Sequence, residues 1–276
     1  MDEMQNQEAP KMSSVENDQE EFELNHTDKL VGVFSEPTAT FAKTAKFPPK
    51  TSDWIIPILV VIVIAILSQV VMMNNPAIRQ SIMEKQMERF EKQFQDAVDK
   101  GQMTQEQANE QLDTLRDRMS QSGTLQLIST VVGIPIVVFI IFFIISGFFL
   151  LVVKVGLKGD GVYKDAMVAY GLPHYIIAIQ QIVMVIAALA TSKVFTGTSV
   201  ADFIGSDKTT MAGFFLGKLD VFSIWFYVVF GIGLSKMFKS SDVKKYVIAV
   251  IGVWIVFSLI FFYIAKAVPF LAGFAG

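Results

Sequence analysis

The strongest constraint on the fold is an uncharged apolar run that extends from Leu125 to Val153. A helix rises about 1.5 Å per residue, so a run of this length exceeds the roughly 30 Å hydrocarbon core of a bilayer. Four other apolar runs are also read as spans, although the fourth has only 15 uncharged residues, from Val221 to Ser235. The predicted fold class is an all-α integral membrane protein with a five-span helical bundle. The spans are expected at about residues 54–73, 125–153, 166–190, 219–238 and 246–266.

The composition agrees with a polytopic membrane protein. Of the 276 residues, 52% are hydrophobic and 18% are charged, so the chain is too apolar for an ordinary soluble domain but has aqueous parts. No basic stripe supports nucleic-acid binding. The chain has no cysteine, which excludes disulfides and thiolate metal sites. The N-terminus lacks the pattern of a cleavable signal peptide, so the first span is expected to act as an uncleaved insertion signal.

Two polar segments precede the first span. Residues 1–28 contain nine acidic residues and a single Lys, which predicts a disordered tail. Residues 29–53 mix aromatic and basic residues, which predicts a short interfacial helix on the membrane surface. A simple tether is the alternative. The candidate membrane-surface contacts of this segment are Phe34, Phe41, Lys43, Lys46 and Lys50.

Residues 76–122 form a charged insert within the membrane domain of residues 54–276. Apolar residues keep helical spacing on both sides of Gly101, and Thr104 with Gln107 forms a capping box. This pattern predicts a helical hairpin of the coiled-coil kind, whose two apolar stripes pack together. The expected seam is formed by Ile82, Phe90, Phe94, Leu112 and Leu115.

The charge distribution predicts the orientation in the membrane. The turns after the second and fourth spans hold seven Lys, which favours placing both turns and the N-terminus in the cytoplasm. With five spans, the C-terminus and the hairpin insert are then extracytoplasmic.

Polar residues in the third and fourth spans are the candidate site residues. His174 and Gln181 lie seven residues apart on nearly one helical face, with Gln180 about 100° away from Gln181. Polar groups at this depth either bond a neighbouring helix or line a ligand path, and we expect the first. Asp220 is either an interfacial cap beside Lys218 or a buried proton or ion ligand. Nothing in the sequence indicates a catalytic residue, a metal site or a cofactor.

Several short motifs resemble those of the Ypt/Rab-interacting protein (Yip) domain family, in particular its bacterial branch. They are Val33 to Pro37 with Phe41, Gly159 to Lys164 followed by Ala169 to Pro173, and Gly233 to Ser235. The resemblance implies a five-span bundle with a cytoplasmic N-terminus, which for a bacterial member means the cytoplasmic (inner) membrane. Eukaryotic members resemble membrane adaptors for Rab-type GTPases that use an Asp-Leu-Tyr-Gly-Pro motif. This chain has Phe34-Ser35-Glu36-Pro37 instead, so GTPase binding is not carried over.

Two classes of function therefore stay open. The first is a non-enzymatic membrane adaptor or organiser that contacts the lipid bilayer and protein partners not yet identified, with homo-oligomerisation open. The second is a small transporter or channel that uses the polar face of the third span. The adaptor is preferred, because the five spans show no internal repeat and much of the charge lies outside them.

Overall fold

The computed structural model describes residues 22–121 and 123–268, so the disorder expected for residues 1–21 lies outside it. Every regular element in these two ranges is helical. In chain order they are α1 (His26–Ser35), α2 (Pro37–Thr44), α3 (Ser52–Asn74), α4 (Pro76–Asp99), α5 (Gln105–Gln121), α6 (Gly123–Leu151), η1 (Val152–Leu157), α7 (Tyr163–Gly171), α8 (His174–Thr191), α9 (Val200–Ile204), α10 (Met211–Lys218), α11 (Val221–Met237) and α12 (Val243–Ala267).

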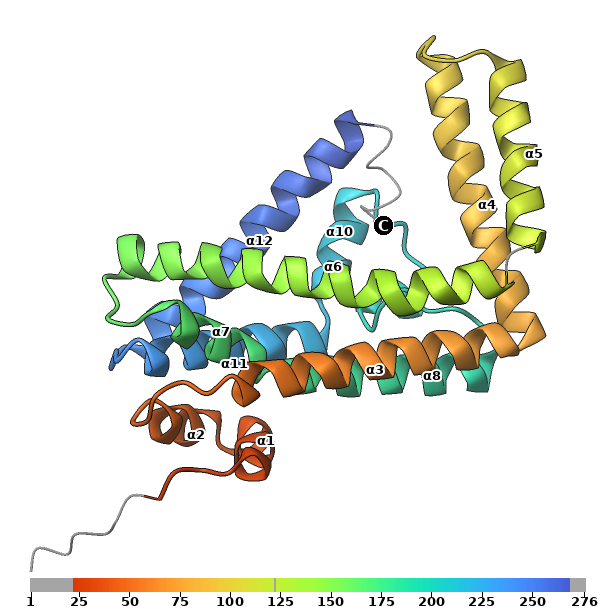
Figure 1. Ribbon diagram of the computed structural model, residues 1–276. Helices are drawn as coiled ribbons and strands as arrows, with labels where there is room; N and C mark the ends of the chain where they lie inside the picture. The colour runs from red at the N-terminus through yellow and green to blue at the C-terminus, as the bar shows by residue number, and fades with distance from the viewer. Residues whose placement is uncertain (1–21, 122, 269–276) are drawn as a thin grey trace, which may run out of the picture.

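Long apolar helices form the body of the molecule. α3 packs on α6, α7 and α8, while α11 packs on α7, α8 and α12 (Figure 1). Within the described residues, four helical segments are long and apolar enough to cross a membrane. A fifth is counted only if α10 and α11, which meet at a 60° bend, are taken as one span. Since 17-residue α11 alone reaches only about 25 Å, the fifth span depends on the residues around this bend.

The third apolar segment is interrupted near its start. α7 ends at Gly171 and α8 begins at His174, with Pro173 at the junction. Proline has no backbone N–H and its ring clashes with the preceding turn, so it favours a break at this point. α7 can lie close to α3 here because a Cβ atom on Gly171 would stand only 2.6 Å from the Cα of Trp54.

The N-terminal region differs from the sequence expectation. The sequence predicts a disordered tail over residues 1–28, but α1 begins at His26, capped by the Asn25 side chain, which accepts from Asp28 N–H. The single interfacial helix expected over residues 29–53 is divided at Glu36, where the backbone leaves helical geometry (φ −141°, ψ 61°), and Pro37 starts α2. α1 and α2 pack together and sit against the bundle at the start of α3 (Figure 1).

The insert forms two adjacent helices. α4 and α5 run side by side in opposite directions and leave the bundle at the far end of α3, as Figure 1 shows. Asn75 caps α4 by accepting from Ala77 N–H and Ile78 N–H, and Gly101 adopts a left-handed conformation in the connecting turn (φ 67°). Arg116 on α5 pairs with Glu91 on α4 at 3.0 Å. The expected seam residues are all half-buried: Ile82, Phe90, Phe94, Leu112 and Leu115.

Candidate functional site

Asp220 is the centre of a polar cluster inside the bundle. Its side chain is 6% exposed and caps α11 by accepting from Phe222 N–H at 3.0 Å. The hydroxyl of Ser223 donates to the second carboxylate oxygen at 3.0 Å. Asp220 is thus both a helix cap and a buried acid, and it is no partner of Lys218, whose ammonium lies over the rings of Phe214 and Trp254.

The same carboxylate joins α8 and the loop after it to α11. Gln180 donates its side-chain N–H to Asp220 at 2.9 Å and to the Thr198 hydroxyl at 2.8 Å. Thr198 in turn donates to Asp220 at 2.8 Å. A buried carboxylate is tolerated in apolar surroundings only when several donors compensate its lost hydration. The cluster therefore ties three segments together through one acid.

His174 lies beside this cluster but does not join it. Its Nδ1 is 2.8 Å from the backbone oxygen of Tyr170, one turn earlier in its own segment. The sequence predicts a hydrogen bond from His174 across to a neighbouring span, and the structure differs. The neighbours of the imidazole are the rings of Phe142 on α6 and Phe226 on α11, in edge-on contacts with centroid distances of 6.0 and 5.2 Å. The contact of His174 with its neighbours is therefore aromatic.

A cavity of about 260 Å³ adjoins the imidazole. Residues from α3, α6, α7, α8 and α11 line it: Val61, Val138, Ile141, Phe142, Tyr170, His174, Ile177, Ser223, Phe226 and Tyr227. Most of the lining is aliphatic or aromatic, with polar groups only at the imidazole, two phenols and one hydroxyl. Such a lining suits an apolar group or acyl chain better than a hydrated ion.

Gln181 is oriented differently from Gln180. Its Oε1 atom is buried and has no hydrogen-bond partner among the described residues. The structure thus brings Gln180 and Asp220 together, places His174 at an adjacent cavity, and leaves Gln181 outside the cluster. In the described part of the chain, no group of three His, Asp or Glu side chains is placed to hold a metal ion.

A second polar cluster, which sequence reasoning missed, fixes α1 to the bundle. Lys29 is 2% exposed, and its ammonium lies 2.7 Å from the carboxylate of Asp53, which is also 2% exposed. His26 Nε2 is 2.5 Å from the hydroxyl of Tyr175 on α8. The partners are 24 and 149 residues apart, so no local pattern could have paired them. We call Lys29, Asp53, His26 and Tyr175 the N-terminal clamp.

The aromatic residues of α1 and α2 face the protein. Phe41 was expected to touch the membrane surface, but its side chain is fully buried and lies against Gly233 of α11. The apolar face of α2 packs on α11, which explains the difference. Phe34 is half-buried, with its ring edge-on to Trp225 of α11 at 5.5 Å.

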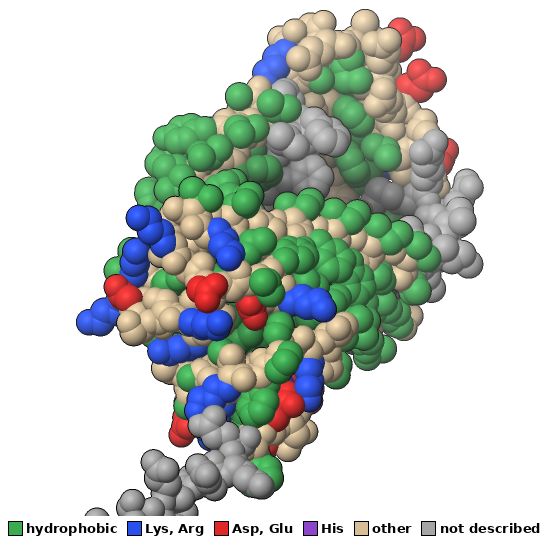
Figure 2. Space-filling view, turned by 60° about the vertical axis from the view of Figure 1, so that its left-hand side comes forward, with side chains coloured by type: hydrophobic (Ala, Val, Ile, Leu, Met, Phe, Trp, Pro, Cys, Tyr) green, Lys and Arg blue, Asp and Glu red, His purple; other side chains and the backbone are tan. Residues whose placement is uncertain are grey.

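Lysines gather at the end of the bundle where α1 and α2 lie. Lys43, Lys46 and Lys50 are exposed there, and Lys50 pairs with Glu23 at 2.6 Å. The turns after η1 and α11 contact each other, since Asp160 N–H donates to Phe238 O at 3.2 Å, and Figure 1 places them at the same end. Figure 2 shows basic and acidic side chains grouped beside a broad hydrophobic surface. This grouping is typical of the boundary between lipid and water.

The helices and the polar cluster define an integral membrane protein whose intramembrane polar groups join helices. The Yip1 domain matches residues 31–264, and the chain belongs to this family, as its motifs indicated. No curated protein and no solved structure shows significant similarity to the chain. The structure and the family agree on a membrane protein.

Proposed function

We propose that this protein is a non-enzymatic membrane adaptor that presents α1 and α2 to partner proteins at the cytoplasmic surface. The observation that carries the proposal is the N-terminal clamp, together with the burial of Phe41 in the bundle. Desolvating two charges costs free energy, so a flexible tether is not expected to contain a buried ion pair. Docking holds the two helices in one orientation, which lowers the entropy that a partner must overcome on binding.

The outer face of the docked helices offers a mixed surface. Val31 is 57% exposed, and Thr38 and Lys43 are exposed on the same pair of helices. An exposed apolar residue among polar and charged ones is typical of the small surfaces that transient complexes use. The excess of Lys at this end supports its cytoplasmic placement.

Site-specific photo-crosslinking in cells tests the proposal. A photoreactive residue at Val31 or Thr38 should give discrete protein adducts, and a probe at Ile248, which is 70% exposed on α12, serves as a lipid-facing control. Adding Asp53→Ala, which removes the clamp, should abolish the Val31 adducts while the protein stays in the membrane. Adducts that survive clamp removal, or a Val31 probe that yields no more protein adducts than Ile248, would contradict the adaptor.

The cavity beside His174 supports a second candidate, the binding of a small apolar solute or acyl chain within the bundle. If the protein were a small transporter or channel, its solute would pass through the same cavity. Against it, Gln180 and Asp220 are engaged with one another and with Thr198 and Ser223, as expected of groups that join helices. Tyr227→Ala should enlarge the cavity, and a gain in binding of a fluorescent fatty acid without loss of partner adducts would favour the second candidate.

A further inference from the structure

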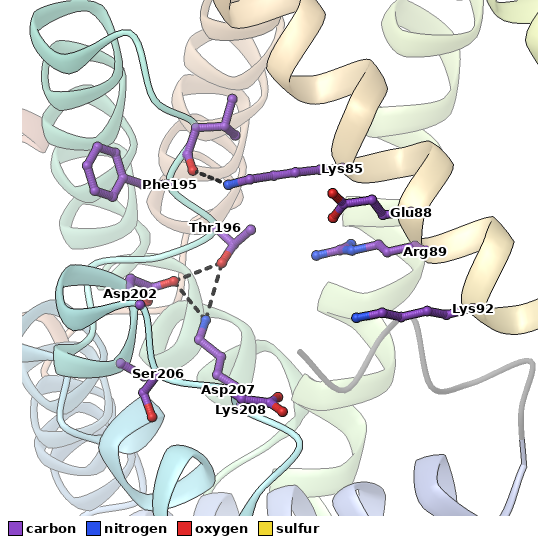
Figure 3. Close-up of a pocket in the computed structure, with 13 residues that line it drawn as sticks. Lys85, Glu88, Arg89, Lys92, Phe195, Thr196, Asp202, Ser206, Asp207 and Lys208 are labelled. Atoms are coloured by element: carbon purple, nitrogen blue, oxygen red, sulfur yellow. Dashed lines mark hydrogen bonds and ion pairs between the residues drawn. The ribbon is translucent and has the colours of Figure 1, made fainter.

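A cleft of about 440 Å³ separates the insert from the loop that follows α8. Its first wall is one face of α4, with Lys85, Glu88, Arg89 and Lys92 at helical spacing. Its second wall is formed by residues 194–196, 201–202 and 205–208. Figure 3 shows the four α4 side chains directed across the cleft toward the second wall. α4 follows the C-terminal end of α3, whereas Asp53 of the N-terminal clamp lies in the first turn of α3.

A hydrogen bond joins the two walls, and an ion pair lies within the second. Lys85 donates from its ammonium to the backbone oxygen of Val194 at 2.9 Å and so bridges the cleft at one side. On the second wall, Asp202 is 4% exposed and pairs with Lys208 at 2.8 Å. Burial alone would raise the pKa of Asp202, but hydrogen bonds from Lys208, Ser199 and Thr196 lower it below its usual range. Asp202 and Lys208 therefore neutralise each other.

Two cations of the first wall form no close ion pair in the described part of the chain, although Lys92 interacts electrostatically with Asp207 across the cleft. Neither Arg89 nor Lys92 has a carboxylate within 4.0 Å among the described residues, and both are exposed. Two carboxylates moderate the charge: Glu88 on α4, and Asp207, which accepts from the backbone and hydroxyl of Thr209 at 2.9 and 2.7 Å. The lining has four cations and three carboxylates in all, so its net charge is +1.

The surroundings of the cleft are those of a lipid boundary. Phe203 and Ile204, which directly precede the lining residue Gly205, are 66% and 64% exposed. Exposed aromatic and aliphatic groups beside cations mark the depth at which lipid headgroups meet acyl chains. A guanidinium and an ammonium one turn apart are suited to the oxygens of a phosphate.

We propose that the cleft between α4 and residues 194–208 binds a phosphodiester or phosphate anion, held by Arg89 and Lys92. One phosphodiester carries a single negative charge, which matches the net charge of the lining. A membrane lipid headgroup and a soluble phosphate share this chemistry, and the experiment separates the two sources.

Binding is measured on the full chain purified in a maltoside detergent, which has no phosphate. The probes are phosphatidylglycerol, a diacylglycerol with the same acyl chains and inorganic phosphate, and the readout is the thermal unfolding midpoint over a probe titration. Phosphatidylglycerol should raise the midpoint and the diacylglycerol should not. Protection by inorganic phosphate at equal concentration, dependent on the same residues, would assign the site to a soluble anion and still support the proposal.

Three variants make the test specific, and all alter exposed side chains, so folding without probe should be unchanged. Arg89→Gln with Lys92→Gln should weaken the apparent affinity by about tenfold or more. Glu88→Gln should strengthen it by removing an opposing charge. Arg79→Gln with Lys100→Gln removes one cation from α4 and one from the residue directly after it, both outside the cleft, and should leave the affinity as it was.

The proposal is overturned if the Arg89 and Lys92 double variant binds phosphatidylglycerol as the unaltered protein does. It is equally overturned if the Arg79 and Lys100 double variant loses as much affinity, because the effect would then come from overall charge. Equal protection by the diacylglycerol would show that acyl chains alone are recognised, and would also overturn it.

Discussion

Lys29 and Asp53 are buried where the chain enters the bundle, and the charge of each compensates the charge of the other. Both side chains are 2 to 3% exposed, and Tyr175 and His26 complete the polar surroundings. Removing one partner of such a buried pair lowers the stability of the protein much more than replacing both partners by apolar residues. The reason is that the remaining partner is left as an uncompensated buried charge.

The clamp gives the first prediction. Asp53→Ala should lower the free energy of unfolding by about 3 kcal/mol, whereas Lys29→Met with Asp53→Leu should recover most of that loss. Lys50→Gln breaks the pair with Glu23, but Lys50 is 55% exposed, so the expected loss is much smaller than that of Asp53→Ala. Thermal unfolding in detergent and protease cleavage before α3 measure both effects. Equal losses for Asp53→Ala and Lys50→Gln would show that the clamp is no stronger than a surface pair.

His174 gives the second prediction. Its bond to Tyr170 O and its aromatic neighbours are those of a structural residue. His174→Asn should retain normal abundance and any cellular phenotype, and His174→Leu should lower stability by about 1 kcal/mol or less. The measurements are protein abundance in membranes and complementation of a deletion strain. If His174→Asn is folded and abundant yet fails to complement, the cavity has a role in ligand binding or proton transfer.

At the scale of elements, helix contact depends on glycine where backbones meet. A Cβ atom on Gly231 of α11 would lie 2.6 Å from the Cα of Val247 on α12. Because the neighbouring atom belongs to the backbone of α12, it cannot move away as the end of a flexible side chain could. Gly252 of α12 has no neighbour within 4 Å of a built Cβ, so it offers a matched control.

Gly231→Ala should therefore destabilise the protein by about 1–3 kcal/mol, since the added methyl overpacks the contact of α11 with α12. Gly252→Ala should be neutral or slightly stabilising, because alanine favours helix in an open position. Thermal unfolding of the two variants in the same detergent gives the comparison. A Gly231→Ala variant as stable as Gly252→Ala would mean that α11 and α12 are farther apart than the structure has them.

The hairpin gives a further prediction at this scale. Phe94→Asp places a carboxylate in the half-buried seam next to Phe90, whose ring centroid lies 6.3 Å from that of Phe94. Because burying an unpaired carboxylate is costly, α4 and α5 should separate while membrane insertion continues. Limited proteolysis of membranes measures this, and Gln86→Asp on the exposed face of α4 is the control. Unchanged protease resistance of Phe94→Asp would refute packing of the two stripes.

The sequence located helices better than it located their contacts. The apolar runs at residues 54–73 and 246–266 correspond to α3 and α12 within a few residues, because hydrophobic length is a local property. The docking of α1 could not be foreseen, since Lys29 and His26 meet partners that only the folded chain brings near. Phe41 was misplaced for the same reason: an aromatic residue among lysines resembles a membrane contact until α11 covers it.

At the scale of the whole molecule, the two ends of the bundle are chemically distinct. The clamp, α2 and the turns near Asp160 and Phe238 share one end, and the α4 cleft with residues 194–208 occupies the other. Lysine-rich turns favour the cytoplasm for the first end.

Single cysteines test this orientation, because the native chain has none. An impermeant maleimide applied to intact cells should label Gln102→Cys in the hairpin turn and leave Ser240→Cys unlabelled until the cells are opened. Both sites are exposed or half-buried in turns, so either should react once reached. Labelling of Ser240→Cys alone in intact cells would invert the proposed topology, and the adaptor surface would then face outward.

The burial of Phe41 against α11 also sets an order of events during synthesis. Phe41 leaves the ribosome roughly 190 residues before Gly233, the residue against which it finally packs. At about 5–20 residues per second, that interval is on the order of ten to forty seconds. Throughout it, α2 has no α11 to cover its apolar face, so the nascent chain exposes an apolar helical segment. Ribosomes stalled before residue 221 should therefore carry chains whose N-terminal helices recruit chaperones, and release of that chaperone would coincide with insertion of α11.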